Sequence, residues 1–315
     1  MLTPLLLFVA GLLALFFGAH LLIMGASRMA RDLGISGLVI GLTVVAMGTS
    51  MPELVVGIMA SVQNSPDIAI GNVLGSNIAN IALILGLAAI IRPIPVQMRL
   101  PAREVPIMIG ASLLFYLFAL DGILTRSDGG ALLAGLIIYT VYLLRGARTE
   151  APKVEAEYKW FISPGGTLAG HVVLTVFGSL ILLVGAYSVV NGVEHVALLL
   201  GVSELAVGLT VVALGTSLPE LATAVAASVQ NEGDILLGNV VGSNVFNVLA
   251  VLGIASMARP MDVSRSVMMI EAPVMLAVSV LLLPFVWTAL RLTRLEGGLL
   301  VATYAAFVIW VALPN

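Results

Sequence analysis

Long apolar runs dominate this chain, and short polar breaks rich in glycine, proline or charge separate them. A helix that crosses the hydrocarbon core of a bilayer needs about 20 mostly apolar residues, and several runs reach that length. The pattern predicts an all-α integral membrane protein with about ten transmembrane helices, at residues 3–25, 35–62, 67–91, 104–120, 129–145, 168–190, 200–229, 234–257, 268–289 and 296–313. The long polar stretch Arg145–Lys159 predicts a flexible connection. The expected organisation is residues 1–147, a cytoplasmic linker at 148–163, and residues 164–315.

Composition supports a membrane protein and excludes several other classes. Of the 315 residues, 60% are hydrophobic and 10% are charged, and the mean hydropathy is +1.13. The chain contains no cysteine, which excludes disulfides and thiolate metal sites. A net charge of −3 argues against nucleic acid as a partner. Because Met1 to Pro4 carry no basic residue, residues 3–25 are expected to be a retained first span rather than a cleaved signal peptide.

One block of sequence occurs twice, with a constant offset of 167 residues. Residues 34–93 align with residues 201–260 without a gap, and 34 of the 60 aligned positions are identical. This is too many identities for two apolar stretches that merely share a composition. Both copies carry Gly-Thr-Ser-x-Pro-Glu, ending at Glu53 and Glu220, and both continue to a Gly-Ser-Asn-x-x-Asn motif. The chain is therefore predicted to consist of two related halves.

Five spans in each half require the second half to enter the membrane inverted relative to the first. With the N-terminus outside the cell, the C-terminus is outside too. The predicted cytoplasmic loops then hold 11 of the 14 basic residues, namely Arg28, Arg31, Arg92, Arg99, Arg103, Arg145, Arg148, Lys153, Lys159, Arg291 and Arg294. The other three are Arg126, Arg259 and Arg265. This asymmetry satisfies the positive-inside rule and predicts two inverted-topology five-helix repeats in the plasma membrane.

The first duplicated motif places hydroxyl and carboxyl groups at membrane depth. On a helix, Thr49 and Ser50 would share a face with Glu53, because they precede it by four and three residues. Pro52 lacks an N–H and crowds the carbonyl four residues before it, so carbonyls from Ala46 to Thr49 are expected to leave the helical ladder. The second copy repeats the arrangement with Ala213, Thr216, Ser217, Pro219 and Glu220.

The second motif adds Ser76 and Asn80 on one helical face, and its other copy adds Ser243 and Asn247. All four segments together offer carboxylates, hydroxyls, amide oxygens and backbone carbonyls. This oxygen-only set suits Ca²⁺ and Na⁺ and disfavours zinc or copper. An ionised carboxylate at mid-membrane costs about 2.5–3.5 kcal/mol, so two of them need a compensating role. The alternative is that both glutamates are buried hydrogen-bonded braces, although no Lys or Arg lies nearby in sequence to pair with them.

These motifs resemble the α repeats of the Ca²⁺/cation antiporter superfamily, specifically the sodium/calcium exchanger family in its compact prokaryotic form. The resemblance covers nearly the whole chain. For Ca²⁺ it implies a site of Glu53, Glu220 and the carbonyls of Thr49 and Thr216. For Na⁺ it implies the carbonyls of Ala46 and Ala213 and the side chains of Ser50, Ser76, Ser217 and Ser243. Asn80 and Asn247 match the pair that flanks the middle of the site. Some members carry Asp at the position of Asn247, so the amide here removes a third carboxylate.

The resemblance implies secondary active exchange of Na⁺ for Ca²⁺ by alternating access. With Glu53 and Glu220 ionised, the empty site is formally −2, so one Ca²⁺ neutralises it and three Na⁺ leave +1. Exchange in that ratio would be electrogenic. Sliding of spans 3–25 and 168–190 is expected to gate the site. Antiport coupled to H⁺ or dependent on K⁺ is the alternative within the same fold. Proton-coupled relatives typically carry Gly-Asn-x-x-Glu, and K⁺-dependent ones usually have Asp where Glu220 stands.

Two other classes of function are weaker interpretations. A closed site with two carboxylates argues against a channel with a continuous pore. An intramembrane enzyme is not expected, because the chain has no His-Glu-x-x-His motif and no phosphate-binding loop. No cofactor is expected, since Na⁺ and Ca²⁺ would be transported substrates. The lipid bilayer is the expected partner, and the sequence leaves the oligomeric state open, with a monomer as the simplest expectation.

Overall fold

The computed structural model of the chain is built almost entirely of helices and describes residues 2–158, 166–199 and 213–312. The helices of the first half are α1 (Leu2–Leu33), α2 (Gly37–Ile40), η1 (Gly41–Val45), α3 (Ala46–Thr49), α4 (Met51–Val62), α5 (Pro66–Ile78), η2 (Ala79–Leu85), α6 (Gly86–Ile91), η3 (Leu100–Glu104), α7 (Val105–Phe118), η4 (Ala119–Asp121) and α8 (Arg126–Tyr158). Those of the second half are α9 (Leu168–Leu199), α11 (Ala213–Thr216), α12 (Leu218–Gln230), α13 (Gly233–Phe246), η6 (Asn247–Leu252), α14 (Gly253–Ala258), η7 (Val267–Glu271), α15 (Ala272–Trp287), η8 (Thr288–Leu290) and α16 (Arg294–Ala312). The short strands are β1 (Ile94–Pro95), β2 (Ile123–Leu124), β3 (Met261–Asp262) and β4 (Arg291–Leu292).

Within the described part of the chain, eight helical stretches are long and apolar enough to cross a membrane. They are Leu6–Leu33, Pro66–Ile91, Leu100–Asp121, Arg126–Ala147, Leu168–Val193, Gly233–Ala258, Val267–Trp287 and Arg294–Val311. Each overlaps one of the ten predicted spans. A ninth candidate, on the predicted span 35–62, is the pair Gly37–Thr49 and Met51–Val62, which is bent by 48°. The predicted span 200–229 includes residues 200–212, which lie outside the described residues.

Two spans form the centre of the bundle. The continuous stretch α13–η6–α14 is enclosed along almost its whole length, and α5–η2–α6 along most of its length. The other six of the eight long stretches are buried over a minority of their residues, and large apolar side chains such as Phe16, Ile138 and Val173 lie on their exposed faces. The buried centre, by contrast, holds polar side chains, including two glutamates. An apolar exterior around a centre with polar groups is what a helical bundle in hydrocarbon requires.

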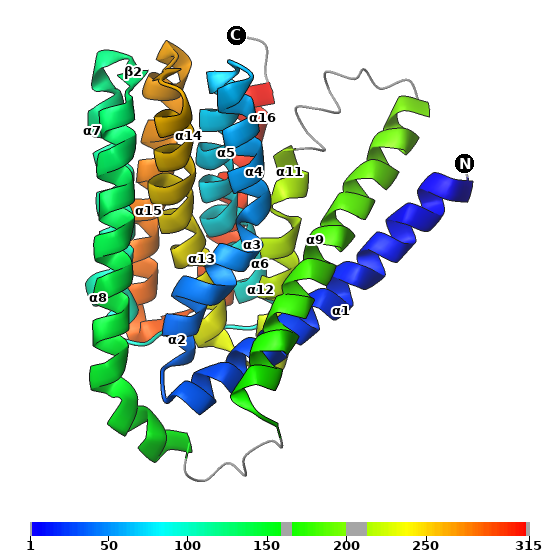
Figure 1. Ribbon diagram of the computed structural model, residues 1–315, viewed down its shortest axis with the longest axis vertical. Helices are drawn as coiled ribbons and strands as arrows, with labels where there is room; N and C mark the ends of the chain where they lie inside the picture. Colours follow the sequence, from blue (N-terminus) through cyan, green and yellow to red (C-terminus); the bar gives the residue numbers. More distant parts are fainter. Residues whose placement is uncertain (1, 159–165, 200–212, 313–315) are drawn as a thin grey trace.

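Helices α1 and α9 pack along each other and are inclined to the rest of the bundle (Figure 1). A Cβ atom placed on Gly18 would lie 2.6 Å from the backbone nitrogen of Leu182, and one on Gly178 would lie 2.5 Å from that of Leu22. Backbones can approach this closely only where both helices carry glycine. The same close approach recurs along the contact at Gly11, Gly25, Gly185 and Gly192. The first spans of the two halves therefore form one tightly packed pair.

Two antiparallel strand pairs tie loops of the first half to loops of the second. In one pair β1 lies beside β4, with Ile94 opposite Leu292; in the other β2 lies beside β3, with Ile123 opposite Asp262. Because α7 runs from β1 to β2, the two pairs lie at opposite ends of the bundle. Each pair joins two loops that the sequence assigns to the same side of the membrane.

The segment Arg145–Lys159 is not the flexible connection that its polar composition predicts. Helix α8 continues through it as far as Tyr158. Its alanine, glutamate and lysine residues have high helix propensity, and adding residues to an existing helix avoids the cost of nucleation. Residues 159–165 lie outside the described residues, so the remainder of the predicted linker stays a prediction.

Candidate cation site

Each half contributes a helix that breaks just before its buried glutamate. Helix α3 ends at Thr49, Ser50 adopts φ −83° and ψ 12°, and α4 follows. Ser217 has nearly the same conformation, φ −89° and ψ 5°, between α11 and α12. A proline lies in the first turn of α4 and of α12, where its missing N–H leaves no helical bond unmade. Thr49 and Glu53 therefore lie on separate helical segments. The break near the proline is as expected, but the two side chains do not share the face of one helix as their four-residue spacing predicts.

The two glutamates are fully buried and bind across the boundary between the halves. The Ser50 hydroxyl donates to Oε1 of Glu220 at 3.0 Å, and the Ser217 hydroxyl donates to Oε1 of Glu53 at 3.4 Å. Both glutamates have 0% exposure. Because each serine binds the carboxylate of the other half, these four residues form a single site. This crossing is not evident from the sequence, because each serine precedes the glutamate of its own motif by only three residues.

Several oxygens of the site are buried without a hydrogen-bond partner among the described residues. They are Oε2 of Glu53, Oε2 of Glu220, and the amide oxygens Oδ1 of Asn80 and Asn247. Neither glutamate forms an ion pair with a described Lys, Arg or His. A buried acceptor that is left unsatisfied costs about 1–3 kcal/mol, and more if it is charged. A cation bound between the halves would satisfy acceptors of this kind.

Two threonines of the site contact asparagines that the sequence analysis missed. Thr49 Oγ1 donates to Oδ1 of Asn239 at 3.1 Å, and Thr216 Oγ1 donates to Oδ1 of Asn72 at 3.3 Å. Asn72 also donates from Nδ2 to the backbone carbonyl of Glu53 at 3.4 Å. Each threonine and its asparagine belong to different halves. Both asparagines follow a glycine and are identical in the two copies, which is the signal that could have found them.

The serines and asparagines of the second motif lie in the same polar network. Ser76 Oγ accepts a hydrogen bond from Nδ2 of Asn247 at 3.2 Å, and Ser243 Oγ lies 3.5 Å from Thr49 Oγ1. Ser76 lies near the end of α5, which continues as the π-helix η2, and Ser243 lies near the end of α13, which continues as the π-helix η6. Asn80 lies within η2, and Asn247 is the first residue of η6. π-Helical turns are rare and occur frequently at functional sites. The structure therefore brings the serines, threonines and asparagines of the prediction together with the two glutamates.

The two alanines whose carbonyls are expected Na⁺ ligands are only partly described. The Ala46 carbonyl accepts hydrogen bonds from the Ser50 N–H at 3.0 Å and from the Thr49 hydroxyl at 3.3 Å. It is therefore engaged within the helix in this conformation, whereas the sequence predicted that it would be released. Ala213 begins α11 and directly follows residues 200–212, which lie outside the described residues. The role of both carbonyls as ligands stays a prediction.

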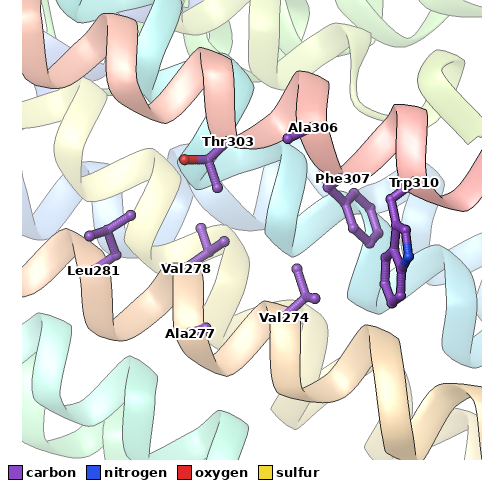
Figure 2. Close-up of a pocket in the computed structure, with 8 residues that line it drawn as sticks. All are labelled: Val274, Ala277, Val278, Leu281, Thr303, Ala306, Phe307 and Trp310. Carbon is purple, nitrogen blue, oxygen red and sulfur yellow. The ribbon is translucent and has the colours of Figure 1, made fainter.

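An apolar groove between α15 and α16 is separate from this site (Figure 2). It has a volume of about 480 Å³ and is lined by Val274, Ala277, Val278, Leu281, Thr303, Ala306, Phe307 and Trp310. The hydroxyl of Thr303 in this lining donates to the Leu299 carbonyl of its own helix at 2.9 Å. The lining contains no carboxylate, so this groove does not have the chemistry of a cation site.

The donor set of the candidate site is that of a hard cation. Across the described ranges no three or more His, Cys, Asp or Glu side chains gather to hold a metal ion. The site instead combines two carboxylates with neutral hydroxyl and amide oxygens. Such a set suits Na⁺ or Ca²⁺, whereas zinc and copper favour nitrogen and sulfur ligands.

Comparisons with known proteins agree with this chemistry. The family described as sodium/calcium exchanger protein matches residues 3–145 and 170–313. The sodium/calcium exchanger MaX1 of Methanosarcina acetivorans is 34% identical, over 96% of this chain and 97% of that protein. The inner membrane protein YrbG of Escherichia coli is 36% identical, over 98% of this chain and 95% of that protein. A solved structure of the sodium-calcium exchanger NCX_Mj, soaked with Na⁺ and Sr²⁺, matches with a TM-score of 0.86 and 32% identity, over 100% of this chain and 99% of that one. This chain is a multi-pass membrane protein that belongs to the sodium/calcium exchanger protein family.

Proposed function

We propose that this chain is a secondary active antiporter that exchanges Na⁺ for Ca²⁺ across the membrane. The observation that carries the proposal is the pair of buried glutamates, Glu53 and Glu220, each with one unpartnered oxygen and no ion pair with a described residue. Two unpaired carboxylates in a membrane interior are costly unless a cation neutralises them. MaX1 and NCX_Mj are both named as sodium/calcium exchangers, which supports the same pair of ions.

The ions would bind to oxygens contributed by both halves. Ca²⁺ takes about six to eight oxygen ligands, so the two carboxylates must be supplemented by neutral oxygens such as the carbonyls of Thr49 and Thr216. Asn80 and Asn247 can add their unpartnered amide oxygens. The proposed Na⁺ ligands are Ser50, Ser76, Ser217 and Ser243 with the carbonyls of Ala46 and Ala213. An ion that binds both carboxylates competes with the serine hydroxyls that now donate to them.

The charge of the site makes Ca²⁺ and Na⁺ mutually exclusive. With Glu53 and Glu220 ionised, the empty site carries two negative charges. One Ca²⁺ neutralises them, and adding Na⁺ to a Ca²⁺-loaded site would leave excess positive charge in a low-dielectric centre. Exchange of three Na⁺ for one Ca²⁺ moves one net charge in each cycle. Transport in that ratio is therefore electrogenic.

The two halves, residues 1–147 and 164–315, are proposed to be inverted five-helix repeats with the site at their interface. Reciprocal contacts support this arrangement. The bond from Ser50 to Glu220 has a counterpart 167 residues away in the bond from Ser217 to Glu53. The bond from Thr49 to Asn239 has its counterpart in the bond from Thr216 to Asn72. A two-fold relation between halves generates contacts in such pairs.

Alternating access is proposed to come from sliding of α1 and α9 against the rest of the bundle. The glycine contact between them favours movement of the two helices as one body. Helix α9 also touches the site helix α3, where a Cβ on Gly48 would lie 3.0 Å from Oγ of Ser179. In this proposal both termini are extracytoplasmic and the protein resides in the plasma membrane. The two strand pairs, each joining loops assigned to one side, support that topology.

Transport in proteoliposomes tests the proposed function. Purified protein is reconstituted with Na⁺ inside, diluted into Na⁺-free medium containing radiolabelled Ca²⁺, and kept at equal pH on both sides. The proposal predicts uptake that needs internal Na⁺ and is absent in Glu53→Gln. Each cycle would move three positive charges out and two in, so uptake should increase when a K⁺ diffusion potential makes the interior positive and decrease when it makes the interior negative. Uptake that ignores both potentials would contradict electrogenic exchange.

The same vesicles separate the coupling ions. H⁺-coupled or K⁺-dependent antiport of the same fold is the alternative function. Uptake that persists without Na⁺ and follows an imposed pH gradient would establish coupling to H⁺. Uptake that needs K⁺ on the same side as Ca²⁺ would establish dependence on K⁺. Neither outcome is expected. Both motifs read Gly-Thr-Ser-x-Pro-Glu rather than the Gly-Asn-x-x-Glu typical of proton-coupled relatives, and Glu220 stands where K⁺-dependent relatives usually have Asp.

A further inference from the structure

Four asparagines from the two halves form a hydrogen-bonded clasp in the centre of the bundle. Nδ2 of Asn77 donates to the backbone carbonyl of Asn244 at 3.2 Å, and Nδ2 of Asn244 donates to that of Asn77 at 3.3 Å. Oδ1 of Asn244 accepts from Nδ2 of Asn80 at 3.0 Å, and Oδ1 of Asn77 accepts from Nδ2 of Asn247 at 3.0 Å. All four side chains are buried. We call these four residues the asparagine clasp.

The inner pair of the clasp, Asn77 and Asn244, uses both ends of its amides on protein partners. Beyond the bonds within the clasp, Nδ2 of Asn77 lies 3.7 Å from Sδ of Met275 on α15, and Nδ2 of Asn244 lies 3.5 Å from Sδ of Met108 on α7. These methionines, like the asparagines, are 167 residues apart. Because their amides are fully engaged, Asn77 and Asn244 are not ion ligands in this conformation.

The outer pair of the clasp has the opposite property. Asn80 and Asn247 are held by their Nδ2 groups, while Oδ1 of each is buried without a partner among the described residues. An amide can present to an ion either its oxygen, which attracts a cation, or its NH₂ group, which repels one. Oδ1 of Asn244 accepts from the NH₂ group of Asn80, and Oδ1 of Asn77 accepts from that of Asn247. These bonds fix the orientation in which the oxygens of Asn80 and Asn247 remain available to a cation.

We propose that Asn77 and Asn244 are positioning residues, which direct the amide oxygens of Asn247 and Asn80 toward the transported cation. This inference rests on the proposed function, because it assumes that the site between the halves binds Na⁺ and Ca²⁺. It assigns a role to two asparagines that do not touch the ion themselves. Their contribution to cation affinity acts through the orientation of a neighbouring amide.

The NH₂ groups of Asn247 and Asn80 differ in the number of acceptors that hold them, and this difference provides a test of the proposal. Nδ2 of Asn247 has a second acceptor, Oγ of Ser76 at 3.2 Å. Nδ2 of Asn80, by contrast, has one acceptor among the described residues, which is Oδ1 of Asn244. Loss of Asn244 should therefore free the Asn80 amide to rotate, whereas loss of Asn77 leaves Asn247 still held by Ser76.

The test measures cation affinity of the purified full-length protein by its thermal unfolding as Na⁺ or Ca²⁺ is titrated. Asn244→Ala should raise the half-saturating Na⁺ concentration about fivefold, the factor expected for the loss of one net hydrogen bond, and Asn77→Ala should raise it less. A purely structural role predicts equal effects, because the two substitutions remove equivalent contacts between the halves. Met108→Leu, which removes only the sulfur contact of Asn244, is the matched control and should leave the affinity unchanged.

A double-mutant cycle tests whether Asn244 acts through Asn80. Asn80→Ala should weaken cation binding, and adding Asn244→Ala should weaken it no further. Equal effects of Asn77→Ala and Asn244→Ala, or additive effects of Asn80→Ala and Asn244→Ala, would overturn the proposal.

If Asn244→Ala does not fold, Asn244→Ser replaces it in both comparisons, since the serine hydroxyl is too short to hold the Asn80 amide. A wild-type protein that binds Na⁺ but does not exchange it for Ca²⁺ would refute the proposed function and leave the clasp to be judged by these binding data. A wild-type protein that no cation stabilises would refute the clasp as well.

Discussion

A disulfide that ties α9 to the site helix α3 should arrest transport reversibly. A Cβ atom on Gly48 would lie 3.7 Å from Cβ of Ser179, and disulfides hold Cβ atoms about 3.5–4.5 Å apart. The variant Gly48→Cys with Ser179→Cys can therefore close the bond without a large movement of the backbone. The chain has no cysteine of its own, so no competing disulfide can form.

The geometry sets how much sliding the cross-link would allow. A shift of α9 by one helical turn, about 5.4 Å, at right angles to the line between the Cβ atoms would take their separation from 3.7 Å to about 6.5 Å. A shift of half a turn would take it to about 4.6 Å, which is the limit for a disulfide. The bond therefore blocks any slide of more than about half a turn. If exposure of the site needs such a slide, transport should fall in proportion to the cross-linked fraction.

The assay compares Na⁺-driven Ca²⁺ uptake before oxidation, after oxidation and after reduction, with the cross-linked fraction measured by mass spectrometry. The control pair, Gly37→Cys with Asp234→Cys, has Cβ atoms 3.5 Å apart and joins α2 to α13 within the bundle. It should form its disulfide and continue to transport. Full transport by fully cross-linked Gly48→Cys/Ser179→Cys protein would refute the sliding of α9 against α3. Arrest of both pairs would show that any cross-link between the halves stops the cycle.

Three further predictions concern the site and the helix contact. Glu220→Gln should abolish Na⁺-driven Ca²⁺ uptake and the rise in melting temperature on adding Ca²⁺, because it removes one of the two neutralising carboxylates; survival of either effect would contradict its role. In ion-free buffer, Ser50→Ala should lower the free energy of unfolding by about 1.5–3 kcal/mol, the worth of a hydrogen bond to a charged group. Ser217→Ala should lower it less, because its bond to the carboxylate is 3.4 Å long rather than 3.0 Å. Gly18→Ala should destabilise the protein by about 1–3 kcal/mol, since its Cβ would lie 2.6 Å from the backbone of α9, whereas Gly130→Ala, where the space is open, should not. Unfolding in detergent checks both comparisons, and equal stability of the two glycine variants would refute the close packing.

Features that depend on local sequence were predictable. The length of an apolar run limits whether a helix can cross the bilayer, and eight predicted spans coincide with long apolar helices. Pro52 and Pro219 predicted the helix breaks, which lie at Ser50 and Ser217. The duplication of the acidic motif predicted two glutamates in one site.

Features that depend on how the halves meet were not predictable. The serine beside each glutamate turns to the carboxylate of the other half, and nothing in the spacing of Ser50 and Glu53 distinguishes that partner from its neighbour in sequence. The contacts of Asn72, Asn77 and their counterparts likewise join residues far apart in the chain. The helical extension of α8 differs for another reason: polar composition predicts flexibility, but the helix propensity of the alanine, glutamate and lysine residues decides the structure of this segment.

The most direct test of the account is equilibrium binding of radiolabelled Ca²⁺ to the purified protein as the Na⁺ concentration is raised. The account predicts one Ca²⁺ bound per chain at the paired glutamates. Na⁺ should displace it competitively with a Hill coefficient above one, and Glu53→Gln should not bind it. Ca²⁺ binding that is indifferent to Na⁺, or that survives in Glu53→Gln, would contradict a shared site between the two halves.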